Sequence, residues 1–252
     1  MKRLAPGTIA LAFGALVCGA AGARAQQAAA TPAAAADQQQ DMRPTVAILE
    51  FDVGASIGQD PDDYQPLRKG LAAMTISELA VNPAVRVVER AQIQQILQEQ
   101  DLAKSDRVDP QTALRIGKLL NVRYMVTGTL YDVRGDFRID ARLFDVETSQ
   151  ILQTERVAGR LDNVFDLVTR LAGALMRDTH LPPLERRAME ERRSQGAPPT
   201  AAVMAYSRAV LYADRGDTQR AVEQYRRAIV AFPNYTQAKA DCNRLQAGAC
   251  AS

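Results

Sequence analysis

The sequence predicts an α/β fold, in which helices pack on a mixed β-sheet, followed by a small all-α helical hairpin. Apolar runs of strand length alternate with segments of helical periodicity between residues 44 and 180. Three strand-like segments follow one another at 123–133, 137–146 and 150–158, as expected for an antiparallel meander. Residues 201–247 carry helical patterns only. These observations separate an α/β domain at 44–180 from C-terminal helices.

The first residues have the features of a secretory signal peptide. Lys2 and Arg3 precede a short apolar stretch, and an A-x-A site ends at Ala25. We therefore expect a signal peptide over residues 1–25, cut between Ala25 and Gln26, and export of the mature chain from the cytoplasm. Residues 26–43 are rich in Ala and Gln and have no periodic apolar face, which predicts a disordered linker.

The charge balance argues against a nucleic-acid partner. The chain has 31 Lys and Arg against 29 Asp and Glu, a formal net charge of +2. Three of the basic residues precede the expected cleavage site, so the mature chain has 28 basic and 29 acidic residues, or −1. A protein that binds nucleic-acid phosphates needs a basic surface, and this balance does not supply one.

The α/β region opens with a nearly continuous apolar run at 45–51, typical of a buried central strand, which we expect to end at Gly54. The turn-forming residues that follow predict a loop as far as Pro66. A helix with one apolar face comes next and is expected to stop at Asn82-Pro83.

The next elements are a short strand at 85–88 and a glutamine-rich helix. Glu89-Arg90 lies where that strand feeds the helix, so we expect a structural role, as a helix-starting charge pair or a subunit contact. Asp109 is predicted to cap a third helix that has Pro110 at its first position. After the meander, apolar spacing predicts a last helix over residues 161–177, with Leu161, Val164, Phe165, Val168, Leu171, Ala172 and Leu175 on its core face.

The hairpin between the first two meander strands has Arg134, Gly135 and Asp136 at its tip. Gly135 suits a tight turn, because glycine tolerates positive φ. Alternation along the second strand would fit a sheet in water or a membrane-inserted strand. All the predicted strands are needed to form the sheet, however, so the sequence offers no further pair of segments of ~9–11 residues that could cross a membrane as strands. This favours a strand pair within the sheet.

Four segments, in order within about residues 45–178, resemble the CsgG family of curli-secretion proteins and their holdfast-attachment relatives: VAILEFDVG, VRVVERAQIQQILQEQDLAKS, IGKLLNVRYMVTGTLYDV and LFDVETSQILQTERV. The resemblance implies a CsgG-like α/β domain in a non-enzymatic protein that acts in export or assembly of surface structures. The family's secretion channel is a lipoprotein with additional pore hairpins. Val17-Cys18 does not fit a lipoprotein signal, and no such hairpins are found, which favours an interaction component. The alternative is an oligomeric outer-membrane secretion channel subunit.

Together with the signal peptide, the resemblance implies a periplasmic location in a Gram-negative cell envelope. It also indicates the partners. We expect other envelope proteins or exported polypeptides, and association with the outer membrane that is at most peripheral. Because the family forms rings, a homo-oligomer is a reasonable hypothesis.

Residues 181–200 contain two proline pairs around a charged segment and predict a linker. Residues 201–247 resemble a tetratricopeptide repeat, in which small and aromatic residues let two antiparallel helices pack closely. Ala205 occupies the place of the large aromatic residue expected early in the first helix. One repeat cannot bury its faces alone, so it docks on its own domain, pairs with another copy or holds a partner. The residues that carry the pattern are Ala209, Tyr212, Gly216, Ala221, Tyr225, Ala228 and Pro233.

No pattern in the chain supports catalysis, a metal site or a cofactor. The one histidine, His180, lies next to a predicted helix end and no nucleophile-elbow sequence accompanies it. The cluster of Asp60, Asp62 and Asp63 lacks the spacing of a calcium loop. We therefore expect a protein that is not an enzyme. Cys242 and Cys250 would remain after processing, and a disulfide between them and two free thiols both fit the sequence.

Overall fold

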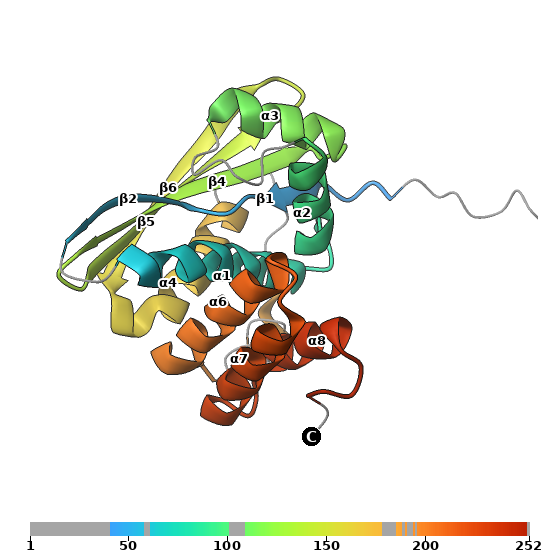
Figure 1. The fold of residues 1–252 in the computed structure, drawn as a ribbon. Helices are drawn as coiled ribbons and strands as arrows, with labels where there is room; N and C mark the ends of the chain where they lie inside the picture. Colours follow the sequence, from blue (N-terminus) through green and yellow to red (C-terminus); the bar gives the residue numbers. More distant parts are fainter. Residues whose placement is uncertain are drawn as a thin grey trace, which may run out of the picture. The chain divides into compact units, whose positions relative to one another are not determined.

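The computed structural model describes residues 41–57, 61–100, 109–177, 185–187, 190, 194 and 196–250. The expected signal peptide, its cleavage site and His180 lie outside the described residues. Residues 42–252 form one compact unit. Within it, a mixed sheet with helices packed on it confirms the predicted fold class, and the C-terminal helices are compatible with the predicted hairpin (Figure 1).

The sheet has six strands in the order β3-β1-β4-β5-β6, with β2 paired to the far end of β4. Parallel pairing joins β1 to both β3 and β4, and β2 to β4. Antiparallel pairing joins β4, β5 and β6, which is the predicted meander. The strands are β1 (Thr45–Ile48), β2 (Asp52–Ile57), β3 (Arg86–Val87), β4 (Tyr124–Val133), β5 (Asp136–Asp145) and β6 (Gln150–Arg160).

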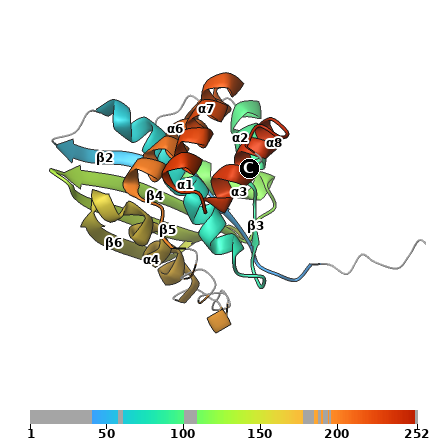
Figure 2. The same cartoon turned by 90° about the horizontal axis from the view of Figure 1, so that it is seen from below.

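Helices cover both faces of this sheet. On one face lie α1 (Pro61–Ala80) and α4 (Val164–Arg177), the latter preceded by a 3₁₀ turn at Leu161–Asn163. On the other face, α2 (Arg90–Glu99) and α3 (Pro110–Leu119) enclose a second, smaller core. The C-terminal helices are α6 (Thr200–Asp214), α7 (Thr218–Ala231) and α8 (Thr236–Leu245), and α6 packs on α1 (Figure 2).

The predicted loop from Ala55 to Pro66 is wrong where the structure describes it, at residues 55–57 and 61–66. After a break at residues 49–51 the chain forms β2, and α1 begins at Pro61 with Pro66 inside it. Tertiary contacts are the reason. The β2 backbone pairs with the end of β4, and the Tyr64 hydroxyl donates a 2.8 Å hydrogen bond to Asp132 Oδ2 on β4. Local turn propensity cannot reveal a partner that is distant in sequence.

The hairpin tip differs slightly from the prediction. Asp136 pairs with Val133, so the turn has two residues, not three. Arg134 has φ +55° and Gly135 has φ +88°, and positive φ at both central positions is the hallmark of a type I′ turn. The Gly135 N–H donates a 2.7 Å hydrogen bond to Asp132 Oδ1. The buried Asp132 carboxylate therefore joins the hairpin turn to α1.

The start of α3 follows the prediction. Asp109 Oδ1 accepts hydrogen bonds from the backbone N–H groups of Gln111 (2.9 Å) and Thr112 (3.1 Å), and Pro110 occupies the first helical position. Hydrogen bonds from the Thr112 hydroxyl and backbone lower the pKa of Asp109.

Candidate functional site

The C-terminal helices dock on the α/β part of the same chain through a very close crossing of α1 and α6. A β-carbon at Gly70 of α1 would lie only 2.8 Å from the backbone Cα of Ser207 on α6. Ser207 is fully buried, and its hydroxyl donates to the Val203 carbonyl at 2.8 Å. The missing side chain at Gly70 thus allows the two helices to pack closely. Of the three arrangements left open by the sequence, this is docking in cis.

A set of charged groups holds the other end of α6. Asp214 ion-pairs with Lys69 of α1 at 3.0 Å and with Arg90 at the start of α2. Lys69 also pairs with Glu50 at 2.9 Å, and Glu50 lies 3.5 Å from Arg68. Burial opposes the charge of Arg90, but the adjacent Asp214 carboxylate outweighs this and raises the pKa of that guanidinium. The contact therefore depends on opposite charges from both parts of the chain.

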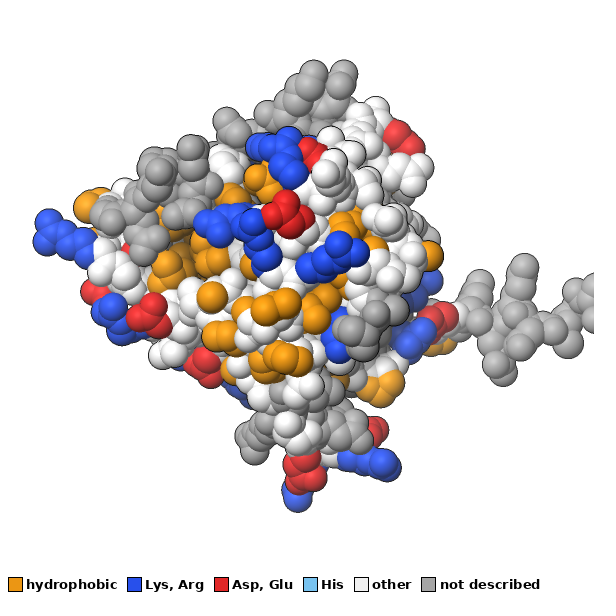
Figure 3. Space-filling view, turned by 60° about the horizontal axis from the view of Figure 1, so that its bottom comes forward, with side chains coloured by type: hydrophobic (Ala, Val, Ile, Leu, Met, Phe, Trp, Pro, Cys, Tyr) orange, Lys and Arg blue, Asp and Glu red, His pale blue; other side chains and the backbone are white. Residues whose placement is uncertain are grey.

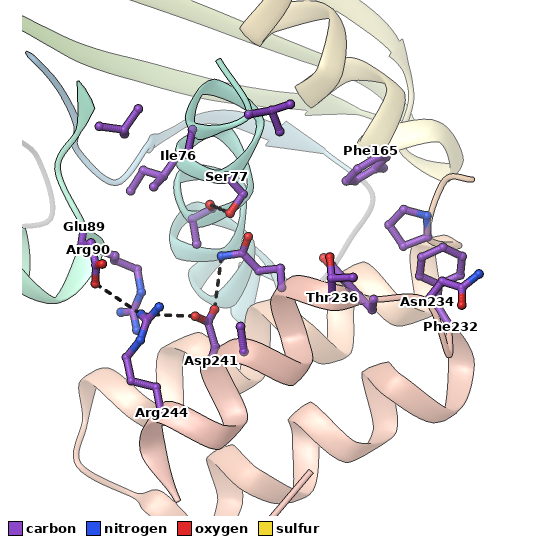
Figure 4. Close-up of a pocket in the computed structure, with 18 residues that line it drawn as sticks. Ile76, Ser77, Glu89, Arg90, Phe165, Phe232, Asn234, Thr236, Asp241 and Arg244 are labelled. Carbon is purple, nitrogen blue, oxygen red and sulfur yellow. Dashed lines mark hydrogen bonds and ion pairs between the residues drawn. The ribbon is translucent and has the colours of Figure 1, made fainter. Parts of the chain in front are cut away.

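A cleft of about 570 Å³ lies between α1, the β3–α2 connection and the C-terminal helices (Figure 4). Its walls are mostly helical. Positions 73, 76, 77 and 80 line it from α1, and positions 236, 237, 240, 241 and 244 line it from α8. Phe165 of α4 and Phe232 close it at one end. In the space-filling view, hydrophobic side chains and charged side chains lie beside one another on the face that carries the C-terminal helices (Figure 3).

Charged side chains at the other end of the cleft pair with one another. Arg244 lies 3.7 Å from Glu89 and 3.4 Å from Asp241. Asp241 also accepts hydrogen bonds from the Tyr206 hydroxyl at 2.8 Å and from Gln237 at 3.3 Å. In Figure 4, Glu89 and Asp241 both point toward Arg244 at this end of the cleft. Such an arrangement presents an apolar floor with a polar, charge-balanced rim.

Glu89 and Arg90 both face the C-terminal helices, Glu89 towards Arg244 on α8 and Arg90 towards Asp214 on α6. The sequence indicated a structural role for this pair, as a helix-starting charge pair or a subunit contact. In the structure, both side chains contact another part of the same chain.

Most of the residues predicted to pack within the helical hairpin lie on α6 and α7, and all three alanines among them are fully buried. Gly216 ends the first helix with φ +74°. Tyr212 is half-buried, with the Arg220 guanidinium 4.7 Å from its ring centroid. Pro233 follows the end of α7. These placements suit a helical hairpin, and its assignment as a tetratricopeptide repeat stays a prediction. The buried alanines are Ala209, Ala221 and Ala228.

A tyrosine cluster fills the centre of the helical unit. The ring of Tyr206 lies 5.9 Å from that of Tyr225 and 5.2 Å from that of Tyr235, centroid to centroid. The repeat pattern expects a large aromatic residue at the position of Ala205 and gives no prediction for the neighbouring position. Tyr206 is fully buried and supplies an aromatic core. Because Tyr206 lies one residue after the expected position, the repeat pattern did not identify it.

In the structure, Cys242 of α8 and Cys250 form a disulfide, with Cα atoms 6.0 Å apart. Gly248, at φ +75°, lets the chain turn back, and the Cys250 N–H donates to Asn243 Oδ1 at 3.2 Å. The bridge attaches the C-terminal segment to the last helix.

Within the described ranges, no group of three or more His, Cys, Asp or Glu residues is placed to hold a metal ion. The side chains of Asp60, Asp62 and Asp63 lie outside the described part. No helix in the same ranges is both long enough and apolar enough to span a membrane.

Comparison with known proteins gives one family match. Residues 26–135 match the family model "Curli production assembly/transport component CsgG". The match supports a CsgG-like assignment and an envelope-associated assembly or export function. It stops at the hairpin tip, so the expected resemblance beyond Gly135 is not covered. A search of curated proteins found no match.

Solved structures show weak similarity. The LpoB C-terminal domain from Salmonella enterica is 14% identical, with TM-score 0.36, over 46% of this chain and 82% of that one. Lipoprotein GNA1162 from Neisseria meningitidis is 14% identical, with TM-score 0.39, over 53% and 96%. The PelC dodecamer from Paraburkholderia phytofirmans is 15% identical, with TM-score 0.34, over 55% and 89%. At these values the similarities carry no functional argument.

Proposed function

We propose that this chain is a non-enzymatic periplasmic protein of the cell envelope. It acts as a protein–protein interaction or assembly component in the export or assembly of surface structures. The match of residues 26–135 to the CsgG family carries the proposal.

The cleft suits binding of polypeptide. Its volume of about 570 Å³ lies in the range of ligand sites, and two helices present side chains to it at helical spacing. Four charged groups at the rim and in the adjoining interface already have partners: Glu89, Arg90, Asp241 and Arg244. Paired charges around an apolar floor favour recognition of a partner's surface over acid–base chemistry.

A subunit of an outer-membrane secretion channel is the second candidate, because the matching family includes transport components. A channel hairpin would have to leave the sheet. Here β4 pairs with β1 and β2 along one edge and with all of β5 along the other, while β5 pairs with β6. This pairing supports the interaction component over the channel subunit.

Carbonate extraction distinguishes these two functions. We expect the full chain, expressed in a Gram-negative host, to be released from washed membranes at high pH, since its strands are paired within one sheet. The released protein should begin at Gln26, as measured by intact mass. Retention in the carbonate-washed membrane would favour the channel subunit, and a mass that retains residues 1–25 would contradict the signal-peptide prediction.

Photocrosslinking in cells tests the interaction role. A benzoylphenylalanine at position 237, inside the cleft, is expected to give discrete crosslinked species that mass spectrometry identifies as envelope or exported proteins. A species of twice the mass would identify a second copy of this chain. The matched control places the same group at position 223, on the exposed surface of α7. Equal crosslinking at both positions would contradict a specific role for the cleft.

A further inference from the structure

One half of the sheet face that bears α2 and α3 is left open among the described residues. The core beneath these two helices includes Met125 of β4 and Phe144 of β5. It includes none of the residues that lie between these two and the hairpin turn at residues 134–135. Beyond this point the same face presents polar side chains around a hollow of about 130 Å³. The hollow is lined by Thr127, Gly128, Thr129, Tyr131, Asp140, Arg142, Thr154 and Arg156.

Strand register brings three arginines around one aspartate. Arg138, Asp140 and Arg142 alternate along β5, so their side chains share a face. On the neighbouring strand β6, Arg156 is the direct partner of Asp140. One carboxylate stands among three guanidinium groups, which leaves a local charge of +2. At the hairpin end of the face, Asp136 and Arg160 are opposite one another and balance.

Asp140 orients two of the arginines. Its Oδ1 accepts a 3.0 Å hydrogen bond from Arg156 Nε and lies 3.2 Å from Arg138 Nε in an ion pair without hydrogen-bond geometry. The Arg138 guanidinium also stacks 4.1 Å from the centroid of the Tyr131 ring. Both contacts to Asp140 use Nε, and among the described residues the Nη groups of Arg156 have no carboxylate partner, so they can bind another ligand. An arginine held in this way loses less conformational entropy when it binds an oxyanion.

The third arginine has no carboxylate partner among the described residues. Arg142 is exposed and stands between its two cross-strand neighbours, Thr127 on β4 and Thr154 on β6. Both threonines line the hollow, and their hydroxyls are hydrogen-bond donors of the kind that oxyanions accept.

We propose that this hollow binds an oxyanion of the phosphate class. Arg142 and the Nη groups of Arg156, which both line the hollow, supply the charge-assisted hydrogen bonds. Arg138 adds positive charge beside the hollow, and Asp140 is a positioning residue. Planar guanidinium groups match the geometry of phosphate oxygens, and a local charge of +2 complements a phosphate group. The phosphate belongs either to a free anion or to a lipid headgroup. The site does not depend on the proposed assembly role.

Two probes separate these sources. Inorganic phosphate is titrated into the ¹⁵N-labelled full chain, and the backbone amide signals of Thr127, Arg142 and Thr154 are followed. Sedimentation is then measured with phosphatidylcholine vesicles that contain or lack phosphatidylglycerol. Shifts with inorganic phosphate identify a free-anion site, and binding to anionic vesicles alone identifies a headgroup site. If phosphate causes no shifts and the protein does not bind the anionic vesicles, the proposal is overturned.

Variants assign the response to these residues. Arg142→Gln and Arg156→Gln are each expected to weaken phosphate binding about tenfold, as loss of a charged hydrogen bond does. In the vesicle assay the expected loss is about fivefold for each arginine. Arg227→Gln removes one exposed charge from α7 and should change neither measurement. Equal losses for this control would show a nonspecific charge effect and overturn the site.

Asp140→Asn tests the positioning role. It raises the local charge by one, so a site governed by charge alone would bind phosphate more tightly. If Asp140 positions Arg138 and Arg156, the substitution is expected to weaken binding several-fold despite the added charge. Tighter binding would overturn the assignment of Asp140 as a positioning residue.

Discussion

Gly70→Ala is expected to loosen the C-terminal helices from α1 and to lower the free energy of unfolding by about 1–3 kcal/mol. The new β-carbon would lie 2.8 Å from the backbone Cα of Ser207, so the helices themselves must move apart. Gly70→Leu should release the helices altogether. The chain has no tryptophan, and Tyr206, Tyr225 and Tyr235 cluster in the helical unit. Four of the seven tyrosines lie in the helical unit, so tyrosine fluorescence reports mainly on the helices, and circular dichroism reports on the whole fold.

In the unsubstituted chain, the two signals should follow one urea transition, because the helices and the α/β part share a core. In Gly70→Leu, the tyrosine transition should move to lower urea than the main circular dichroism transition. Gly173→Ala on α4 is the matched control, since only Arg177 Nη1 lies near its new β-carbon, at 3.5 Å. That variant should be as stable as the parent or more so, by up to about 1 kcal/mol. If both alanine variants behave alike, the close α1–α6 crossing is wrong.

Asp132→Ala is expected to lower the free energy of unfolding by about 2–4 kcal/mol. Asp132 is only 1% exposed, and its carboxylate accepts hydrogen bonds from the Tyr64 hydroxyl and the Gly135 N–H. Removal leaves the buried Tyr64 hydroxyl without this acceptor and frees the hairpin turn from α1. Urea unfolding measures the loss, and hydrogen exchange at Gly135 should become faster.

Asp136→Ala provides the comparison at the same turn, because Asp136 is exposed. It should change stability by no more than about 0.5 kcal/mol. Tyr64→Phe removes one of the two hydrogen bonds to Asp132 and should fall between the two variants. Equal effects of Asp132→Ala and Asp136→Ala would contradict the proposed link between the hairpin and α1.

The sequence by itself determined those elements whose signal is local. Asp109-Pro110 specified the start of α3, because the cap and the first helical position are set by neighbouring residues. Alternation specified the meander of β4, β5 and β6, and Gly135 specified its first turn. The small and aromatic residues at 209–228 indicated two helices in close contact.

Only the tertiary structure decided what each face contacts. The segment 52–57 resembles a loop locally and becomes a strand because β4 offers it hydrogen bonds. In the sequence, Gly70 is only a residue of low helix propensity within a helix. Its role in the close packing of α1 and α6 depends on Ser207, which is distant in the sequence. The cleft and the arginine hollow likewise combine residues from separate elements. Periodicity shows which side of an element is apolar or charged, but the partner of that side depends on contacts between distant residues, which no local pattern encodes.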